Sequence, residues 1–157
     1  MKPKVYIETS VVSYQASRPS TDLIVAAHQR LTQEWWEASP DRFDRFVSQT
    51  VIREAAAGDP EAAKERLESL EGMGLLELSE GAYALAAALV ARGALPAEAP
   101  EDALHIAVAT VHGMDYLVTW NCAHIANAQL RCAVEEVCRS LGYEPPIICT
   151  PEELMGG

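Results

Sequence analysis

The chain has 157 residues, 49% of them hydrophobic, which suits one domain over residues 1–157 with a sizeable core. Its net charge is −11, from 12 basic and 23 acidic side chains. This charge disfavours a general nucleic-acid coat protein, because affinity for phosphate comes largely from Lys and Arg. A polyanionic substrate would need a divalent metal or a local basic rim, whereas a basic partner protein would be attracted.

No stretch predicts a membrane span or a signal peptide. The longest Ala/Leu stretch, residues 82–91, is shorter than the ~20 residues that cross a bilayer, and Glu8 interrupts the first apolar run. We therefore expect a soluble, cytoplasmic protein. The cysteines lack C-x-x-C spacing, which disfavours structural zinc and predicts reduced thiols packed in the interior. They are Cys122, Cys132, Cys138 and Cys149.

The first half of the chain alternates short β-rich runs with helical patterns. Strands are expected at residues 5–7, 46–47 and 75–78, and helices at residues 20–38, 50–57 and 60–70. A turn region should follow the first strand, with Ser20 as the N-cap of the long helix. On that helix a four-residue spacing predicts one buried stripe. The stripe consists of Leu23, Ala27, Leu31 and Trp35.

The second half continues this alternation. Helices are expected at residues 79–93, 100–113 and 127–141, strands at 116–119 and 147–149, and a terminal turn at 150–153. The helix at 100–113 is nearly all apolar and should lie in the middle of the molecule. Strands that alternate with helices imply parallel crossovers. The predicted class is therefore α/β, with a parallel five-stranded sheet sandwiched by helices.

Four oxygen-bearing side chains occupy related positions in this pattern. Glu8 ends the first strand, Glu54 lies on the helix after the second, Asp102 opens the apolar helix, and Asn121 follows the next strand. In parallel sheets, strand carboxyl ends and helix N-termini meet at one edge, where ligands bind. These positions are the candidate metal ligands and catalytic residues.

Clustered carboxylates repel one another unless a cation is present, and hard ions such as Mg²⁺ or Mn²⁺ favour carboxylate and water ligands. Two such ions about 4 Å apart would clamp the attacking and leaving oxygens of a phosphodiester and generate hydroxide near neutral pH. The protein would then need no nucleophile or base of its own.

Each candidate has a purely structural alternative. Acids such as Asp102 are favoured in any first helical turn, Glu54 could be a surface acid beside Arg53, and Asn121 could be a turn residue. Glu8 is the strongest candidate, because an acid at the end of a buried strand is costly unless it is paired.

Other polar residues could support these ligands. Thr9 and Ser10 either cap a helix or support the metal shell, and Thr119 offers a third hydroxyl. His105 lies on the same helix face as Asp102, where it either orients that carboxylate or packs in the core.

Aromatic and basic residues give a weaker indication of nucleic-acid binding. Tyr14 and Trp120 could stack on bases, although Trp120 could equally belong to the core. The basic residues that could form a rim are scattered in the sequence. They are Arg18, Arg53 and Arg92.

Four stretches together resemble a PIN domain, in particular the VapC-type toxins of toxin–antitoxin pairs. They are residues 5–11 (VYIETSV), Glu54, residues 101–107 (EDALHIA) and residues 117–121 (LVTWN). The resemblance covers essentially the whole chain and is most specific over residues 101–121. It implies a Mg²⁺- or Mn²⁺-dependent ribonuclease, commonly a homodimer, that acts on RNA and is neutralised by a small antitoxin.

By position, Glu8, Glu54, Asp102 and Asn121 match the acidic quartet of that family. Glu8 stands where Asp is typical, and Asn121 carries no charge where Asp or Asn is seen. Three readings follow: an endoribonuclease of the toxin class, a catalytically weak or inactive PIN-like module that binds RNA or a partner protein, and a structural α/β domain whose acids only cap helices.

Overall fold

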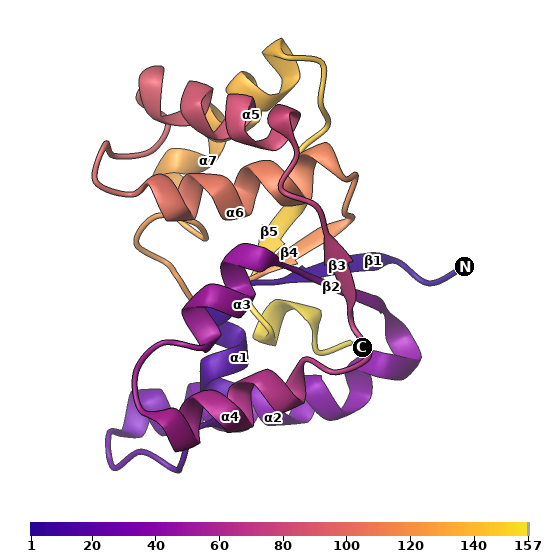
Figure 1. Cartoon of the computed structure of the whole chain (residues 1–157), viewed down its shortest axis with the longest axis vertical. Helices are drawn as coiled ribbons and strands as arrows, with labels where there is room; N and C mark the ends of the chain where they lie inside the picture. Colours follow the sequence, from indigo (N-terminus) through magenta and orange to yellow (C-terminus); the bar gives the residue numbers. More distant parts are fainter. Residues whose placement is uncertain (157) are drawn as a thin grey trace.

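The computed structural model describes residues 1–156 and consists of a five-stranded sheet flanked by helices (Figure 1). The strands are β1 (Lys4–Ile7), β2 (Asp44–Ser48), β3 (Gly74–Leu76), β4 (Tyr116–Val118) and β5 (Ile147–Cys149). The helices are α1 (Thr9–Ala16), α2 (Leu23–Arg42), α3 (Gln49–Ala55), α4 (Pro60–Ser69), α5 (Glu80–Ala91), α6 (Pro100–Val111), α7 (Ala128–Ser140) and the short 3₁₀ helix η1 (Glu152–Leu154).

The sheet is parallel at every pairing and has the order β3-β2-β1-β4-β5. Helices α5, α6 and α7 lie on one side of it, and α1, α2 and α4 lie on the other (Figure 1). The central strand β1 contributes Val5, Tyr6 and Ile7, all fully buried. The predicted α/β class is confirmed. All five strands end at the same edge of the sheet, where the candidate site residues are expected.

Helix α6 lies in the core, as its apolar sequence predicts. Every residue from 103 to 110 is buried, and Pro100 opens the helix with Glu101 and Asp102 in the first turn. Asp59, Ser79 and Asn127 cap helices α4, α5 and α7, since each side chain accepts a backbone N–H of the helix that follows.

The region after β1 differs from the prediction of a turn and a helix capped by Ser20. Helix α1 begins directly after Glu8, and α2 is capped by Asp22, whose carboxylate accepts from the N–H groups of Ile24 and Val25. Threonine, serine and valine give α1 a low helix propensity. Helix α1 packs against α2, α3 and α4 with Val11 and Val12 buried, and this packing outweighs that propensity.

Helix α2 also extends beyond the predicted end at Ala38, passing through Pro40 to Arg42. Proline has no N–H to donate to the carbonyl four residues earlier. The hydroxyl of Ser39 donates to that carbonyl, on Trp36, at 2.7 Å. This replacement hydrogen bond accounts for the tolerance of Pro40 in the last turn.

The predicted buried stripe of α2 is wrong at Leu23, Ala27 and Leu31. Leu23 is 86% exposed, Ala27 is exposed and Leu31 is only partly buried, and of the predicted stripe Trp35 alone is buried. The buried face consists of Gln29, Thr32, Trp35 and Ser39. Polar side chains can be buried when they are hydrogen-bonded. Gln29, for example, donates to the Ser17 hydroxyl and the Arg18 carbonyl. A hydrophobic pattern could not identify this face.

Strand β3 ends at Leu76 instead of residue 78 and includes Gly74, where a Cβ atom would lie 2.5 Å from the Phe46 ring. Gly74→Ala should therefore lower the free energy of unfolding by about 1–3 kcal/mol, the usual cost of overpacking. Urea titration measures the loss. Leu75→Ala is the matched control in the same strand, because Leu75 is 59% exposed; equal stability of the two variants would contradict the predicted clash.

The cysteine prediction is correct for two residues and wrong for two. Cys138 and Cys149 are buried, whereas Cys122 and Cys132 are exposed, and all four thiols are free. Burial raises the pKa of Cys149 to about 12. Within residues 1–156, no helix combines the length and the apolar character that a membrane crossing requires.

Candidate metal centre

Glu8 lies at the end of the central strand and is only 5% exposed. Its backbone N–H donates to the Val118 carbonyl of β4. Its Oε1 atom accepts hydrogen bonds from Ser10 Oγ and Thr119 Oγ1, each at 2.5 Å. Two hydroxyls from separate segments therefore hold a single carboxylate oxygen, which offsets part of the cost of burying this acid.

Glu54 comes from α3, the helix directly after β2. Its Oε1 atom lies 2.5 Å from Thr9 Oγ1, which donates, and 2.7 Å from His105 Nε2. Thr9 and Ser10 thus hold two different carboxylates, and neither hydroxyl caps α1, so the capping interpretation is wrong. One ligand atom from each of Glu8, Glu54 and His105 lies within 4.8 Å of the others. We call these three residues the acidic cluster.

His105 is fully buried and joins the cluster to the core. Its Nδ1 atom lies 2.7 Å from the Tyr6 hydroxyl, which lies 2.8 Å from Ser48 Oγ. Two alternatives were open for His105, orienting the Asp102 carboxylate or packing in the core. The structure shows it buried and hydrogen-bonded to Glu54. Tyr6 and Ser48 were not foreseen, because no spacing along the chain relates them to His105.

Burial and the contacts described above shift the pKa values of Glu54 and His105 in opposite directions. Burial raises the pKa of Glu54, but His105, the Thr9 hydroxyl and the nearby Arg53 together bring it below its ordinary value. Burial lowers the pKa of His105, but the Glu54 hydrogen bond and the surrounding carboxylates raise it overall. Burial also raises the pKa of Tyr6, so its hydroxyl stays protonated.

Asp102 lies one turn before His105 on α6, and its negative charge helps to raise the pKa of His105. Its Oδ2 atom is 2.8 Å from His124 Nδ1. The side-chain oxygen of Asn121 accepts the backbone N–H of His124 at 3.1 Å. Asp102 and Asn121 are therefore both joined to His124, and Asp102 lies outside the 4.8 Å group.

The donor set fits a divalent cation. Within residues 1–156, the hydrogen bonds to Glu8 and Glu54 all engage Oε1, so the Oε2 atoms are free to bind an ion. Carboxylate oxygens are the ligands that hard cations prefer. Of the basic residues considered for a rim, Arg53 lies next to Glu54 and reaches Glu101 at 3.9 Å.

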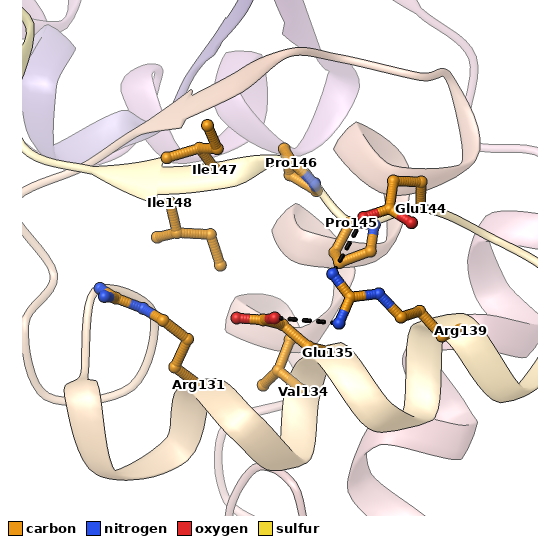
Figure 2. Close-up of a pocket in the computed structure, with 9 residues that line it drawn as sticks. All are labelled: Arg131, Val134, Glu135, Arg139, Glu144, Pro145, Pro146, Ile147 and Ile148. Carbon is orange, nitrogen blue, oxygen red and sulfur yellow. Dashed lines mark hydrogen bonds and ion pairs between the residues drawn. The ribbon is translucent and has the colours of Figure 1, made fainter.

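A separate cavity of about 170 Å³ lies between α7 and β5 (Figure 2). Its walls include Val134 and Ile148, and none of the candidate site residues lines it. Arg139, at its edge, is already paired with Glu135 and Glu144. This cavity therefore offers no alternative set of converging carboxylates.

No protein-family model matches the chain, and no curated protein matches it in sequence. Among solved structures, it is similar to a chain in the crystal structure of VapBC2 from Rickettsia felis bound to a DNA fragment from their promoter. The two share 15% identity with a TM-score of 0.59, over 93% of this chain and 97% of that chain. This likeness, with the all-parallel sheet, confirms the expected PIN-like fold.

Proposed function

We propose that this protein is a divalent-metal-dependent endoribonuclease. In this proposal Glu8 and Glu54 hold Mg²⁺ or Mn²⁺, Asp102 binds directly or through water, and Asn121 is an auxiliary ligand. One observation carries the proposal: carboxylates from two different elements converge at the carboxyl edge of the sheet, each with one oxygen free. Such a pair of like charges is stabilised by a cation.

A bound ion would supply Lewis acidity and lower the pKa of an attacking water. The residues of the chain would fix the ligands. Ser10 and Thr119 hold Glu8 from two sides, which compensates for the extra methylene of a glutamate at this position. His105 holds Glu54 in the same way. Partners of this kind commonly orient the ligands of metal sites.

Asp102 can join the site without losing His124. Its Oδ2 atom is bonded to His124, so its Oδ1 atom is the one that would face the ion. The side-chain oxygen of Asn121 accepts the backbone N–H of His124. It can bind the ion only if it gives up this hydrogen bond or holds both partners at once. The neutral amide and this competing bond favour a centre that depends mainly on the three carboxylates.

The toxin class is part of the same proposal. The structure with the similar fold is one of VapBC2, which supports a small antitoxin as partner. A homodimer, which the family resemblance implies, is part of the same proposal. The net charge of −11 would attract a basic partner, and a basic side chain could enter the acidic cluster in place of the metal. The alternative is an inactive PIN-like module that binds RNA or a protein.

A cleavage assay on single-stranded and structured RNA tests the activity. With Mg²⁺ or Mn²⁺ the wild type should give products, and Glu8→Gln should lose at least about 100-fold in rate, since an ion contributes several kcal/mol to transition-state stabilisation. Glu71→Gln, at an exposed acid in the turn after α4, is the control and should cleave normally. Cleavage that survives EDTA would contradict the proposal, whereas RNA retention without products would favour the inactive module.

A further inference from the structure

Three aromatic rings lie together beside the acidic cluster. They belong to Tyr14 of α1, His28 of α2 and Trp120, two residues after β4. The rings of His28 and Trp120 stack with centroids 4.0 Å apart and planes 12° apart, and Tyr14 lies 6.3 Å from each. All three residues are half-buried, so each keeps part of its surface in contact with solvent. We call them the aromatic cluster.

Hydrogen bonds fix this aromatic cluster to the candidate metal centre. The backbone N–H of Trp120 donates to Ser10 Oγ at 2.8 Å, and the same hydroxyl donates to Glu8. The indole N–H of Trp120 donates to Thr32 Oγ1 of α2 at 2.7 Å, which sets the ring orientation. Tyr14 lies one helical turn after Ser10 on α1. The Trp120 backbone is thus joined to Glu8 through one hydroxyl, and Tyr14 lies one turn from that hydroxyl.

The geometry points to a nucleobase-binding site at the aromatic cluster, where an unpaired base next to the metal-held phosphate stacks. This inference rests on the proposed function and names its substrate class as single-stranded RNA. Aromatic stacking is independent of base identity and needs no charge. With a net charge of −11 and only 12 basic residues, the chain cannot rely on a broad basic groove for affinity. Stacking supplies affinity where the strand meets the metal.

An abasic scan tests this site without any need for cleavage. Binding of a labelled eight-nucleotide RNA to the full chain is measured by fluorescence anisotropy with Ca²⁺, a hard cation that takes carboxylate ligands. In a matched series, one base at a time is replaced by an abasic sugar. At one position the wild type should bind at least about fivefold more weakly, the lower end of what a base stack contributes.

Variants of the aromatic cluster show where on the protein the base at the sensitive position binds. Tyr14→Leu and Trp120→Leu should remove the position-specific loss, whereas Tyr14→Phe, which keeps the ring, should retain it. Tyr83→Leu is the matched control, because Tyr83 is a 52% exposed tyrosine on α5, and it should also retain the loss. Circular dichroism melts confirm that each variant is folded.

Four outcomes would overturn the inference: no measurable RNA binding, equal effects at every abasic position, an unchanged effect in both leucine variants, or loss of the effect in Tyr83→Leu. Failure of this inference can be distinguished from failure of the nuclease proposal. Position-specific binding without cleavage in Mg²⁺ or Mn²⁺ would reject the nuclease and keep the base site, whereas cleavage without position-specific binding would reject the base site alone.

Discussion

Millimolar Mn²⁺ should raise the melting temperature of the wild-type protein, and Glu8→Gln combined with Glu54→Gln should abolish that rise. A ligand that binds only the folded state at 100 times its Kd adds about 2.7 kcal/mol of stability. For a domain of this size that corresponds to a shift of roughly 5–10 °C. The amides keep the size of the two side chains but remove both negative charges that bind the ion. Differential scanning fluorimetry with and without EDTA measures the shift.

Asp102→Asn should remove most of the same shift, because Asp102 lies beside the acidic cluster and its charge acts on His105. Glu71→Gln should leave the shift at the wild-type value. The shift of each variant is taken relative to its own melting temperature in EDTA, because Glu54→Gln also removes the ion pair with His105. A wild-type melting temperature that does not respond to Mn²⁺ would count directly against a metal site here.

His105→Leu should lower the free energy of unfolding of the metal-free protein by about 2–4 kcal/mol. The leucine approximates the volume of the imidazole but leaves the Tyr6 hydroxyl and the Glu54 carboxylate without their partner. Unpaired buried polar and charged groups account for losses of this size. Urea titration in EDTA measures the difference. Tyr6→Phe removes only the hydroxyl and should cost about 1–3 kcal/mol.

The His105→Leu loss should also depend on pH. The pKa of Glu54 is lowered in the folded protein, so its stabilisation is present above the ordinary carboxyl pKa of 4.5 and is lost as the pH falls through the lowered value. The pKa of His105 is raised, so its stabilisation is full below 6.5 and is lost as the pH rises through the raised value. The gap between wild type and variant should therefore be largest near pH 4.5–6.5. A stability difference between wild type and His105→Leu that grows toward pH 9 would contradict an ion pair between Glu54 and His105.

The fold was largely predictable because local signals agreed with it. Short β-rich runs marked the strands, and Asp59 and Ser79 marked helix starts, because their side chains can cap the helix that follows. The prediction failed where tertiary packing overrides local preference. Helix α1 is rich in β-branched residues, and α2 buries hydrogen-bonded polar side chains such as Gln29 and Thr32.

The candidate site was predictable only in part. Strand ends and helix starts placed Glu8 and Glu54 at one edge, and the structure brings them together. The contact between Tyr6 and His105 joins residues 99 apart in sequence. No spacing rule predicts such a contact, because it depends on which strand faces α6. The assignment of Thr9 and Ser10 to different carboxylates likewise depends on side-chain directions in the first turn of α1.

The central claim is that Glu8 and Glu54 share a divalent ion. Crystals grown with Mn²⁺, with anomalous diffraction collected near the manganese edge, test it most directly. We expect one dominant peak about 2.0–2.3 Å from a carboxylate oxygen of each residue, since Mn²⁺ resembles Mg²⁺ in ligand choice and is slightly larger. No peak between these carboxylates at millimolar Mn²⁺, or manganese bound only elsewhere on the acidic surface, would contradict the account.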